Sequence, residues 1–438
     1  MKKLTLKKAC VLLITGMIGS AIFSLSGLTI LYAGPSSILS FIIAAVIEFM
    51  YGLSVAELAT TYKESGGGFI FPEKTFENNF GKLLGFVNTW GLIFADIISI
   101  SFAAFCVSTY VSVIFPILKD YSLIINILSL IICLLINYIS IVATSKFNNV
   151  LGVFLLIVLL FYCFSIIFTG NFNSNNLTPF FTDEGIKGIG TLKALPIAIV
   201  GYSTITSISF LAGEIENPKK NIPRAVTISI LVVAFIYSIV VFLTTSAITS
   251  KELLDSNMIM APLMCVAITK LYSIPLMKEL ISVAAIFALL TTSIVVIAVN
   301  GRNLKAASEH KLLPKVFSKT LKSGTPVFGM TLITVLSAIP LFFGNFIETV
   351  VNEAAIIIVV SIIINFICLY YTRKKFNTNN ELFRAPFSTY VLGIFILILI
   401  ILNVPNVISG GYKLFIITFV WYVIGAFVYF FMRHINGK

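Results

Sequence analysis

The 438-residue chain is 58% hydrophobic and only 11% charged, with a formal net charge of +12. A soluble globular chain carries about a quarter charged residues, so this composition excludes a water-soluble protein of this size. Lysine and arginine gather in short segments between apolar runs, and no basic stripe is interleaved with aromatic residues. The positive charge therefore indicates membrane topology and argues against a nucleic-acid partner.

The chain contains twelve apolar runs of the length that a membrane-spanning helix needs, about 20 residues. In chain order they cover 10–32, 36–60, 84–115, 121–143, 149–169, 190–212, 225–248, 278–303, 327–343, 347–371, 387–408 and 412–432. Backbone groups in lipid need partners within their own segment, so these runs are predicted to be helices. The predicted fold is all-α: a polytopic membrane protein with twelve transmembrane helices and no cleaved signal peptide.

The positions of the basic residues predict the orientation. With the N-terminus in the cytoplasm, 23 of the 30 lysines and arginines fall inside and seven fall outside. The seven are Lys119, Lys187, Lys193, Lys251, Lys270, Lys278 and Lys413. An excess of basic residues on the cytoplasmic side is typical of membrane proteins, so we expect both termini in the cytoplasm and a multi-pass location in the plasma membrane.

The segments between the runs are too short for an independent soluble domain, so residues 1–438 are predicted to form one transmembrane domain. We expect short helices in the inside segment 61–83 and the outside segment 249–277. The six cysteines show no metal-ligand spacing, and they are interpreted as packing residues. No metal site and no cofactor are predicted.

Two of the runs contain small or hydroxyl residues at mid-depth. The first is Gly16–Phe23 in the first run, and the second is Gly201–Ser207 in the sixth. Glycine costs a helix about 1 kcal/mol relative to alanine, so the helix can open at both places. Opened backbone within a membrane persists only where it lines a cavity. The alternative is that the small residues merely let helices pack closely.

An opened helix exposes N–H groups, which suit a carboxylate, and carbonyl groups, which suit an ammonium group or a small cation. Two such breaks together predict a receptor for a zwitterion. They fall at corresponding places in two five-helix units, 10–169 and 190–371, followed by two additional helices in 387–432. Paired interruptions of this kind, in helices 1 and 6 of a 5+5 inverted repeat plus two, are typical of secondary transporters.

Seven motifs occur in an order that resembles one family. They are Gly19-Ser20-Ala21-Ile22-Phe23, Ala33-Gly34-Pro35, Ala56-Glu57-Leu58 with Ser65-Gly66-Gly67-Gly68, Gly85-Phe86 with Trp90, Glu214–Pro223, Asn300-Gly301-Arg302 with Leu313-Pro314, and Phe383–Phe387. Over nearly its whole length the chain resembles the amino acid–polyamine–organocation superfamily of permeases, which share the leucine-transporter fold.

The resemblance implies a substrate site at mid-membrane. Amides around Gly19, Ser20 and Ala21 would hold the substrate carboxylate. Carbonyls near Ile18 and in the stretch Tyr202, Ser203 and Thr204 would hold the amine. Tyr202 would also contribute to an aromatic lid, or it is a packing aromatic with a hydrogen-bonded hydroxyl.

The chain departs from the family pattern in three places. Ala21 stands where glycine is usual and should narrow the site. Ser203 or Thr206, depending on the alignment, stands where many relatives have an acid. Leu155 stands where some proton-coupled relatives have a lysine, so the role of that lysine cannot be transferred. A cationic substrate would need a compensating carboxylate, and we therefore favour neutral amino acids.

Two sets of residues are candidates for ion coupling. The resemblance implies one set, because in sodium-coupled members of the wider fold a Thr-Ser pair in span 8 and carbonyls of span 1 bind sodium. The matching residues here are Thr292 and Ser293, with the carbonyls near residues 15–18, and oxygen ligands suit a hard cation such as sodium. The alternative is that these hydroxyls bond back to their own helix. Asp96 and, with less support, Glu48 lie in apolar runs, where desolvation favours the protonated form and would let an acid carry a proton. Glu57 is interpreted as structural.

These observations predict a secondary active transporter, and not an enzyme, that moves amino acids through the lipid bilayer by alternating access, coupled to protons or sodium. Exchange of amino acids or polyamines remains an alternative. A membrane-embedded enzyme would need clustered acids or histidines within the membrane, and a channel would need a filter loop or a charged ring. The sequence shows neither pattern.

Overall fold

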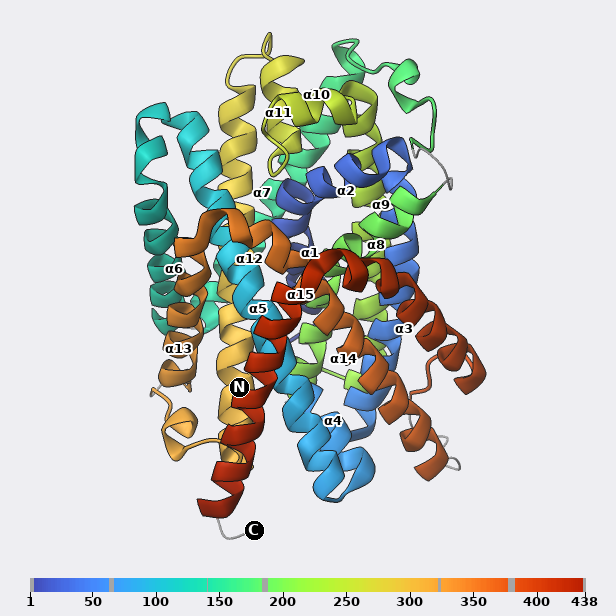
Figure 1. The fold of residues 1–438 in the computed structure, drawn as a ribbon, viewed down its shortest axis with the longest axis vertical. Coiled ribbons are helices and arrows are strands. Elements are labelled where there is room, and N and C mark those ends of the chain that lie inside the picture. The colour runs from blue at the N-terminus through green and yellow to red at the C-terminus, as the bar shows by residue number, and fades with distance from the viewer. Residues whose placement is uncertain are drawn as a thin grey trace.

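A computed structural model describes residues 4–62, 67–139, 141–182, 188–321, 324–376 and 383–435 (Figure 1). Within these ranges the regular elements are helices, with one isolated bridge between Leu4 and Ile215. The all-helical prediction is confirmed for this part of the chain. The helical content follows from the apolar runs, since backbone groups surrounded by lipid must bond within their own segment.

The elements of the first half begin near the N-terminus with a nearly unbroken helical stretch. They are α1 (Leu6–Ser20), the π-helix η1 (Ala21–Leu25), α2 (Ser26–Ala33), η2 (Gly34–Ser36), α3 (Ser37–Tyr62), α4 (Gly67–Phe76), α5 (Asn79–Ile114), η3 (Pro116–Tyr121), α6 (Ser122–Ile139), α7 (Ile141–Phe168), η4 (Ser174–Leu177) and α8 (Ile189–Val200).

The second half begins inside the sixth predicted span. Its elements are the 3-10 helix η5 (Ser203–Glu214), α9 (Pro218–Ala247), α10 (Ser250–Asp255), α11 (Pro262–Thr269), α12 (Met277–Glu309), η6 (Lys315–Ser318), α13 (Val327–Ala338), η7 (Ile339–Phe346), α14 (Ile347–Lys375) and α15 (Thr389–Ile435).

The helices form a bundle in which α12 packs against α5, α1 and α7, while α3 packs against α9 and α8 (Figure 1). Peripheral helices leave large apolar side chains exposed, as Ile124, Leu128 and Leu135 of α6 do. Exposed apolar surface of this extent suits contact with lipid, because in water it would cost free energy. The molecule is therefore a multi-pass membrane protein.

Nine helical stretches within the described ranges are long and apolar enough to cross a membrane, and Val327–Phe343 forms a shorter apolar helix. One of the nine, Leu6–Tyr62, contains the first two predicted runs. The chain turns between them at Gly34, whose φ of 55° lies in the region that favours glycine. The total of twelve spans, the five-helix units 10–169 and 190–371, and the inverted repeat remain predictions.

The last two predicted runs are not separated as expected. We predicted helices over 387–408 and 412–432, but α15 is helical from Thr389 to Ile435 without a non-helical residue. At 1.5 Å per residue it would be about 70 Å long if straight, more than twice the hydrocarbon core of a membrane. Figure 1 shows instead that its ribbon bends over partway along. The reversal is made by bending rather than by a loop.

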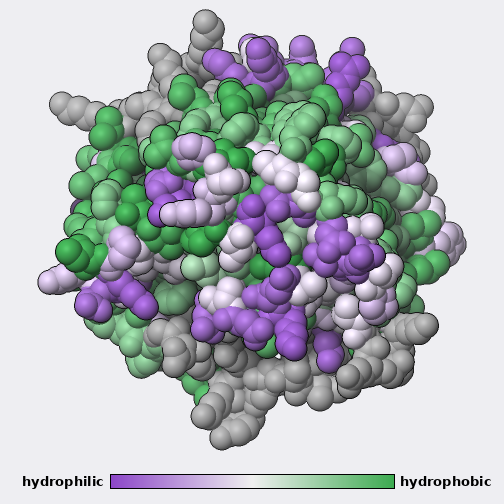
Figure 2. Space-filling model, turned by 90° about the horizontal axis from the view of Figure 1, so that it is seen from above, coloured by the Kyte–Doolittle hydropathy of each residue, from purple (hydrophilic) through white to green (hydrophobic). Residues whose placement is uncertain are grey.

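The two ends of the bundle differ in the elements they carry. Both termini lie in the half of the molecule that contains α4, and α10 and α11 lie at the opposite end (Figure 1). These three helices confirm the predicted short helices in segments 61–83 and 249–277. Figure 2, which looks onto the end with α10 and α11, shows hydrophilic residues over its centre and along part of its edge, with hydrophobic residues between them and around the side. This distribution suits a molecule with water at its ends and lipid around its sides.

Candidate functional site

The α-helix of the sixth span is interrupted where the sequence predicted it. α8 ends at Val200, and the next backbone bonds join residues three apart, from Tyr202 N–H to the Ile199 carbonyl at 3.0 Å and from Ile205 N–H to the Tyr202 carbonyl at 3.0 Å. These are bonds of the 3-10 type. The Ser203 hydroxyl donates to the Val200 carbonyl at 2.9 Å and so pairs one of the carbonyls at the end of α8.

The first span is irregular without being unwound, which corrects the expectation of an opened helix. α1 continues directly into the π-helix η1 and then into α2. In η1 each backbone hydrogen bond joins residues five apart instead of four, which changes the pairing of the carbonyl groups at this turn. Side-chain hydroxyls bond to two of these carbonyls. The Tyr110 hydroxyl donates to the Phe23 carbonyl at 2.6 Å, and the Ser26 hydroxyl donates to the Ile22 carbonyl at 2.6 Å. The irregular turn begins at Ala21, directly after the predicted Gly19-Ser20 pair.

The two irregular segments lie against each other. The Thr204 hydroxyl donates to the Gly16 carbonyl at 3.3 Å, and a β-carbon added to Gly201 would lie 3.1 Å from that of Ala21. The Tyr237 hydroxyl, from α9, lies within hydrogen-bonding distance of the Met17 carbonyl and 3.2 Å from the Gly201 carbonyl. A phenol has one proton to donate, so Tyr237 can bond to only one of these carbonyls at a time.

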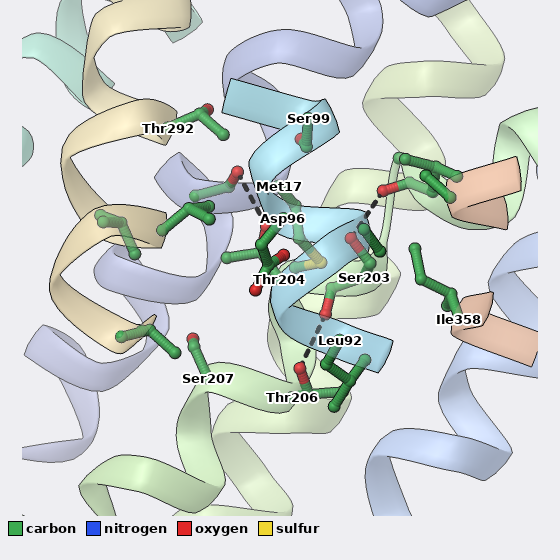
Figure 3. A pocket seen from close by; sticks show the side chains of 18 of the residues that line it. Met17, Leu92, Asp96, Ser99, Ser203, Thr204, Thr206, Ser207, Thr292 and Ile358 are labelled. Atoms are coloured by element: carbon green, nitrogen blue, oxygen red, sulfur yellow. Dashed lines mark hydrogen bonds between the residues drawn. The ribbon is translucent and has the colours of Figure 1, made fainter. Parts of the chain in front are cut away.

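A cavity of about 90 Å³ borders these segments (Figure 3). One water molecule needs roughly 10–15 Å³ by this measure, so the space holds about six to nine water-sized groups. A small neutral amino acid has a similar number of non-hydrogen atoms. The polar residues that line the cavity are Tyr51, Asp96, Ser99, Ser203, Thr204, Thr206, Ser207, Thr292 and Asn303. The rest of the wall is mainly aliphatic, with Ile98, Val295, Val299 and Ile358 among its residues.

Several polar atoms around the cavity have no partner among the described residues. They are the hydroxyl oxygens of Ser207 and Thr292 and the amide oxygens of Asn300 and Asn303. All four side chains are at most 5% exposed. Buried polar groups in proteins are almost always paired, so these oxygens indicate that a polar ligand or water binds here. The Asn300 amide nitrogen donates to the Asp96 carboxylate at 2.7 Å, which fixes that carboxylate at the cavity wall.

Four of the residues predicted from the sequence line the cavity: Ser203, Thr204, Thr292 and Asp96. Figure 3 shows all four facing the same space. Ser203 and Thr204 belong to η5, which together with Tyr202 is called the helix 6 segment below. Thr292 comes from α12 and Asp96 from α5, and these three elements are far apart in the sequence. The structure thus brings together candidates that were proposed separately for substrate and for ion coupling.

Two predicted residues of the first helix, Gly16 and Met17, line the cavity, whereas Ile18, Gly19 and Ala21 do not. Ile18 and Ala21 are 1% and 2% exposed. A β-carbon on Gly19 would lie 1.8 Å from the Thr292 hydroxyl oxygen and 2.8 Å from the Ala288 carbonyl oxygen, so this glycine permits close packing of α1 on α12. The side chain of Ser20 lies outside the described part of the structure.

Two further candidates have partners that fit a packing role. Tyr202 is fully buried, and its hydroxyl donates to the Phe41 carbonyl of α3 at 3.2 Å. The Ser293 hydroxyl donates to the Leu289 carbonyl of its own helix at 2.9 Å. Their binding roles remain predictions. Tyr237 was not predicted as a site residue, because the seventh apolar run, 225–248, contains no glycine to mark it. Asn300 and Asn303 were not predicted either, because an asparagine within a helix has many possible functions.

The fold and the cavity together define a class of protein: a polytopic membrane transporter with a small, partly polar solute site between its helices. Comparison with known families agrees. The sequence model described as amino acid permease matches residues 4–430. The chain therefore belongs to the amino acid permease family, and its membership of the amino acid–polyamine–organocation superfamily is confirmed.

Individual relatives resemble the chain at low identity. A branched-chain amino acid permease of Bacillus subtilis (strain 168) is 25% identical over 450 residues, which cover 97% of this chain and 91% of the relative. A methylthioribose transporter of the same organism is 24% identical, over 94% of this chain and 89% of its own. An aspartate–proton symporter, also from this organism, is 30% identical over 230 residues, which cover 50% of this chain and 43% of the symporter. These relatives are transporters, not enzymes.

Proposed function

We propose that this protein is a secondary active transporter that moves neutral amino acids across the plasma membrane by alternating access. The observation that carries the proposal is the cavity beside the interruption of helix 6, where Ser203, Thr204 and Asp96 meet an aliphatic wall. A polar end and an apolar end in one small space match an amino acid with an aliphatic side chain.

The charge of the lining supports a neutral substrate. Among the described residues, Asp96 is the single acid of the cavity wall and no basic residue lines it. One carboxylate can balance one substrate ammonium group, while the substrate carboxylate can accept hydrogen bonds from hydroxyls such as those of Thr292 and Ser207. A cationic side chain would bring a second positive charge without a second acid, and that is costly at this depth.

The contact between helices 1 and 6 supplies a means of changing access. Thr204 and Tyr237 bond to carbonyls of α1, and Tyr237 also reaches the Gly201 carbonyl. These few bonds hold the two segments together, and their exchange for bonds to substrate would let the segments move. Transport is coupled to protons or sodium, and both termini lie in the cytoplasm.

The test is counterflow in liposomes that contain the purified protein, with each of the twenty amino acids as competitor. We expect small aliphatic amino acids to compete, and arginine and putrescine not to. Methylthioribose belongs in the panel because one relative bears that name. Competition by arginine or putrescine would favour the exchanger alternative, and a folded protein that no amino acid affects would overturn the proposal.

A further inference from the structure

One buried acid of the bundle lies away from the cavity. Glu48 lies in α3, is 0% exposed, and does not line the cavity. Neither of its carboxylate oxygens has a hydrogen-bond partner among the described residues. The ion pairs found in the same part of the chain do not include it either.

The face of α3 that carries Glu48 packs against the interrupted helix 6. Two turns before Glu48, the Phe41 carbonyl accepts the hydroxyl of Tyr202 at 3.2 Å. One turn after it, a β-carbon on Gly52 would lie 3.2 Å from Ile205. Residues at these spacings share one helix face, so Glu48 lies opposite the segment 202–205, where the α-helix changes to the 3-10 form.

Phenols surround Glu48, and no described lysine or arginine forms an ion pair with it. The titratable groups that face it are Tyr51 on its own helix and Tyr202 on the helix 6 segment, both close enough to experience its charge. Tyr237 of α9 packs against Tyr202, with ring centroids 5.1 Å apart. An ionised carboxylate without a counter-charge or a hydrogen-bond partner is strongly disfavoured at such a place, which favours the protonated form of Glu48.

We propose that Glu48 is the proton-binding site of this transporter. It keeps its proton while the helix 6 segment packs on α3, and it releases that proton to water when the segment moves away. In the release step the O–H bond of the carboxyl breaks, water accepts the proton, and the carboxylate is hydrated. The reverse step precedes repacking. The inference rests on the proposed transport function and names its coupling ion.

Asp96 is a weaker candidate for this role. Its carboxylate already accepts a hydrogen bond from Asn300 at 2.7 Å and faces the cavity, where a substrate amine can pair with it. Glu48 has no such partner and borders the part of helix 6 whose structure is irregular. Asp96 therefore binds the substrate amine, and Glu48 binds the coupling proton.

The experiment compares the wild-type protein with Glu48→Gln in sodium-free liposomes, with the membrane potential clamped at zero. A pH gradient of one unit, coupled to one proton, supports about tenfold accumulation of a neutral substrate. We expect the wild type to approach that value and Glu48→Gln to reach only equal concentrations on both sides, while its counterflow remains within about twofold of wild type. Glu309→Gln, which changes an exposed acid at the end of α12, should behave as wild type.

Accumulation by Glu48→Gln that equals wild type would overturn the inference. Wild-type counterflow without proton-driven accumulation would also overturn it, and would leave amino acid transport standing. Absence of counterflow in the wild type would count against the transport proposal instead. A second measurement needs no variant: a hydrophobic carbodiimide, which adds to protonated carboxyls, should label Glu48 in the wild type at acidic pH and leave the ion-paired Glu57 unlabelled. Unlabelled Glu48 would contradict the inference independently of any substrate.

Discussion

Two glutamates of α3 lie in opposite surroundings. Glu57, at the end of the helix near α4, accepts two hydrogen bonds from the Arg373 guanidinium, at 2.9 and 2.6 Å, and one from the Ala385 backbone N–H at 2.7 Å. Glu48, about two and a half turns earlier, has no partner for either oxygen among the described residues. Both side chains are buried, at 3% and 0% exposure.

The difference shows that burial alone does not determine what an acid does in a membrane. Arg373 also donates to the carbonyls of Ala385 and Phe387, so Glu57 belongs to a charged cluster that ties α3, α14 and the segment before α15 together. The two hydrogen bonds from one guanidinium hold the Glu57 carboxylate in place. An acid without a partner is protonated where it is shielded from water and ionised where water reaches it. Only such an acid changes its protonation state when the packing around it changes.

The largest expected effect on stability comes from breaking the ion pair between Glu57 and Arg373. Arg373→Met removes the counter-charge of Glu57 and leaves its carboxylate buried, which typically costs about 3–5 kcal/mol. We expect a large drop in the thermal unfolding temperature of the purified protein in detergent. Arg384→Met is the matched control, because Arg384 is exposed; its guanidinium donates to the Phe376 carbonyl at 3.1 Å.

The same measurement on Glu48→Gln sharpens the comparison. A neutral amide replaces a neutral acid, so we expect a change within about 1 kcal/mol, as is usual when no charge is stranded. A destabilisation by Glu48→Gln as large as that by Arg373→Met would show that Glu48 is also held by a partner, and the distinction between the two acids would be lost.

A smaller effect is expected from the glycine that packs α1 on α12. Gly19→Ala places a methyl group 1.8 Å from the Thr292 hydroxyl oxygen and 2.8 Å from the Ala288 carbonyl oxygen, and the backbone oxygen cannot rotate away. Overpacking of this kind costs about 1–3 kcal/mol. We expect a lower unfolding temperature and weaker substrate competition, because Thr292 also lines the cavity.

Gly393→Ala is the control for that substitution. No described heavy atom lies within 4 Å of the added carbon, and the position is inside helix α15. Alanine there should be neutral or stabilising by up to about 1 kcal/mol. Equal behaviour of the two variants would show that α1 and α12 have room to separate.

Much of the fold follows from the sequence because lipid imposes a simple rule. Apolar runs of sufficient length become helices, and nine helical stretches of the described residues are long and apolar enough to span a membrane, while the number twelve stays a prediction. The last two predicted runs lie within α15, which bends without a loop. The glycine signal was less specific. In helix 6 it coincides with a change to 3-10 geometry, but in helix 1 Gly16 and Gly19 face Thr204 and Thr292 at close range, and the chain stays helical. Nothing local distinguishes a glycine that opens a helix from one that admits a neighbour.

The candidate site was predictable in part. The cavity is lined by four of the predicted residues, Asp96, Ser203, Thr204 and Thr292, and each is a polar residue within an apolar run. Asn303 lies on the same face of α12 as Thr292, three turns further, a signal that helical periodicity could have supplied. The pairing of Glu57 with Arg373 joins residues 316 positions apart, and a single sequence contains no record of such a contact.

The smallest expected effect concerns an acid outside the membrane-spanning helices. Glu73 of α4 lies 3.1 Å from the His310 imidazole at the end of α12. Burial raises the pKa of Glu73, but the hydrogen bond and charge of His310, together with Lys82 and Lys74, outweigh it and leave the pKa below its usual value of 4.5. A carboxyl with a lowered pKa in the folded state contributes stability above its usual range, and that stability is lost as the pH falls through the folded value.

Glu73→Gln should therefore lower the free energy of unfolding by a few tenths of a kcal/mol to about 1 kcal/mol near neutral pH, as is usual for partly exposed pairs. The difference from wild type should shrink towards zero as the pH is lowered through the acid range. Unfolding curves in detergent across this range provide the measurement. Glu309→Gln is the control, since Glu309 forms an exposed pair with Lys305 at 3.5 Å. A difference that grows on acidification would mean that Glu73 is protonated in the folded protein at neutral pH, and it would then resemble Glu48 rather than Glu57.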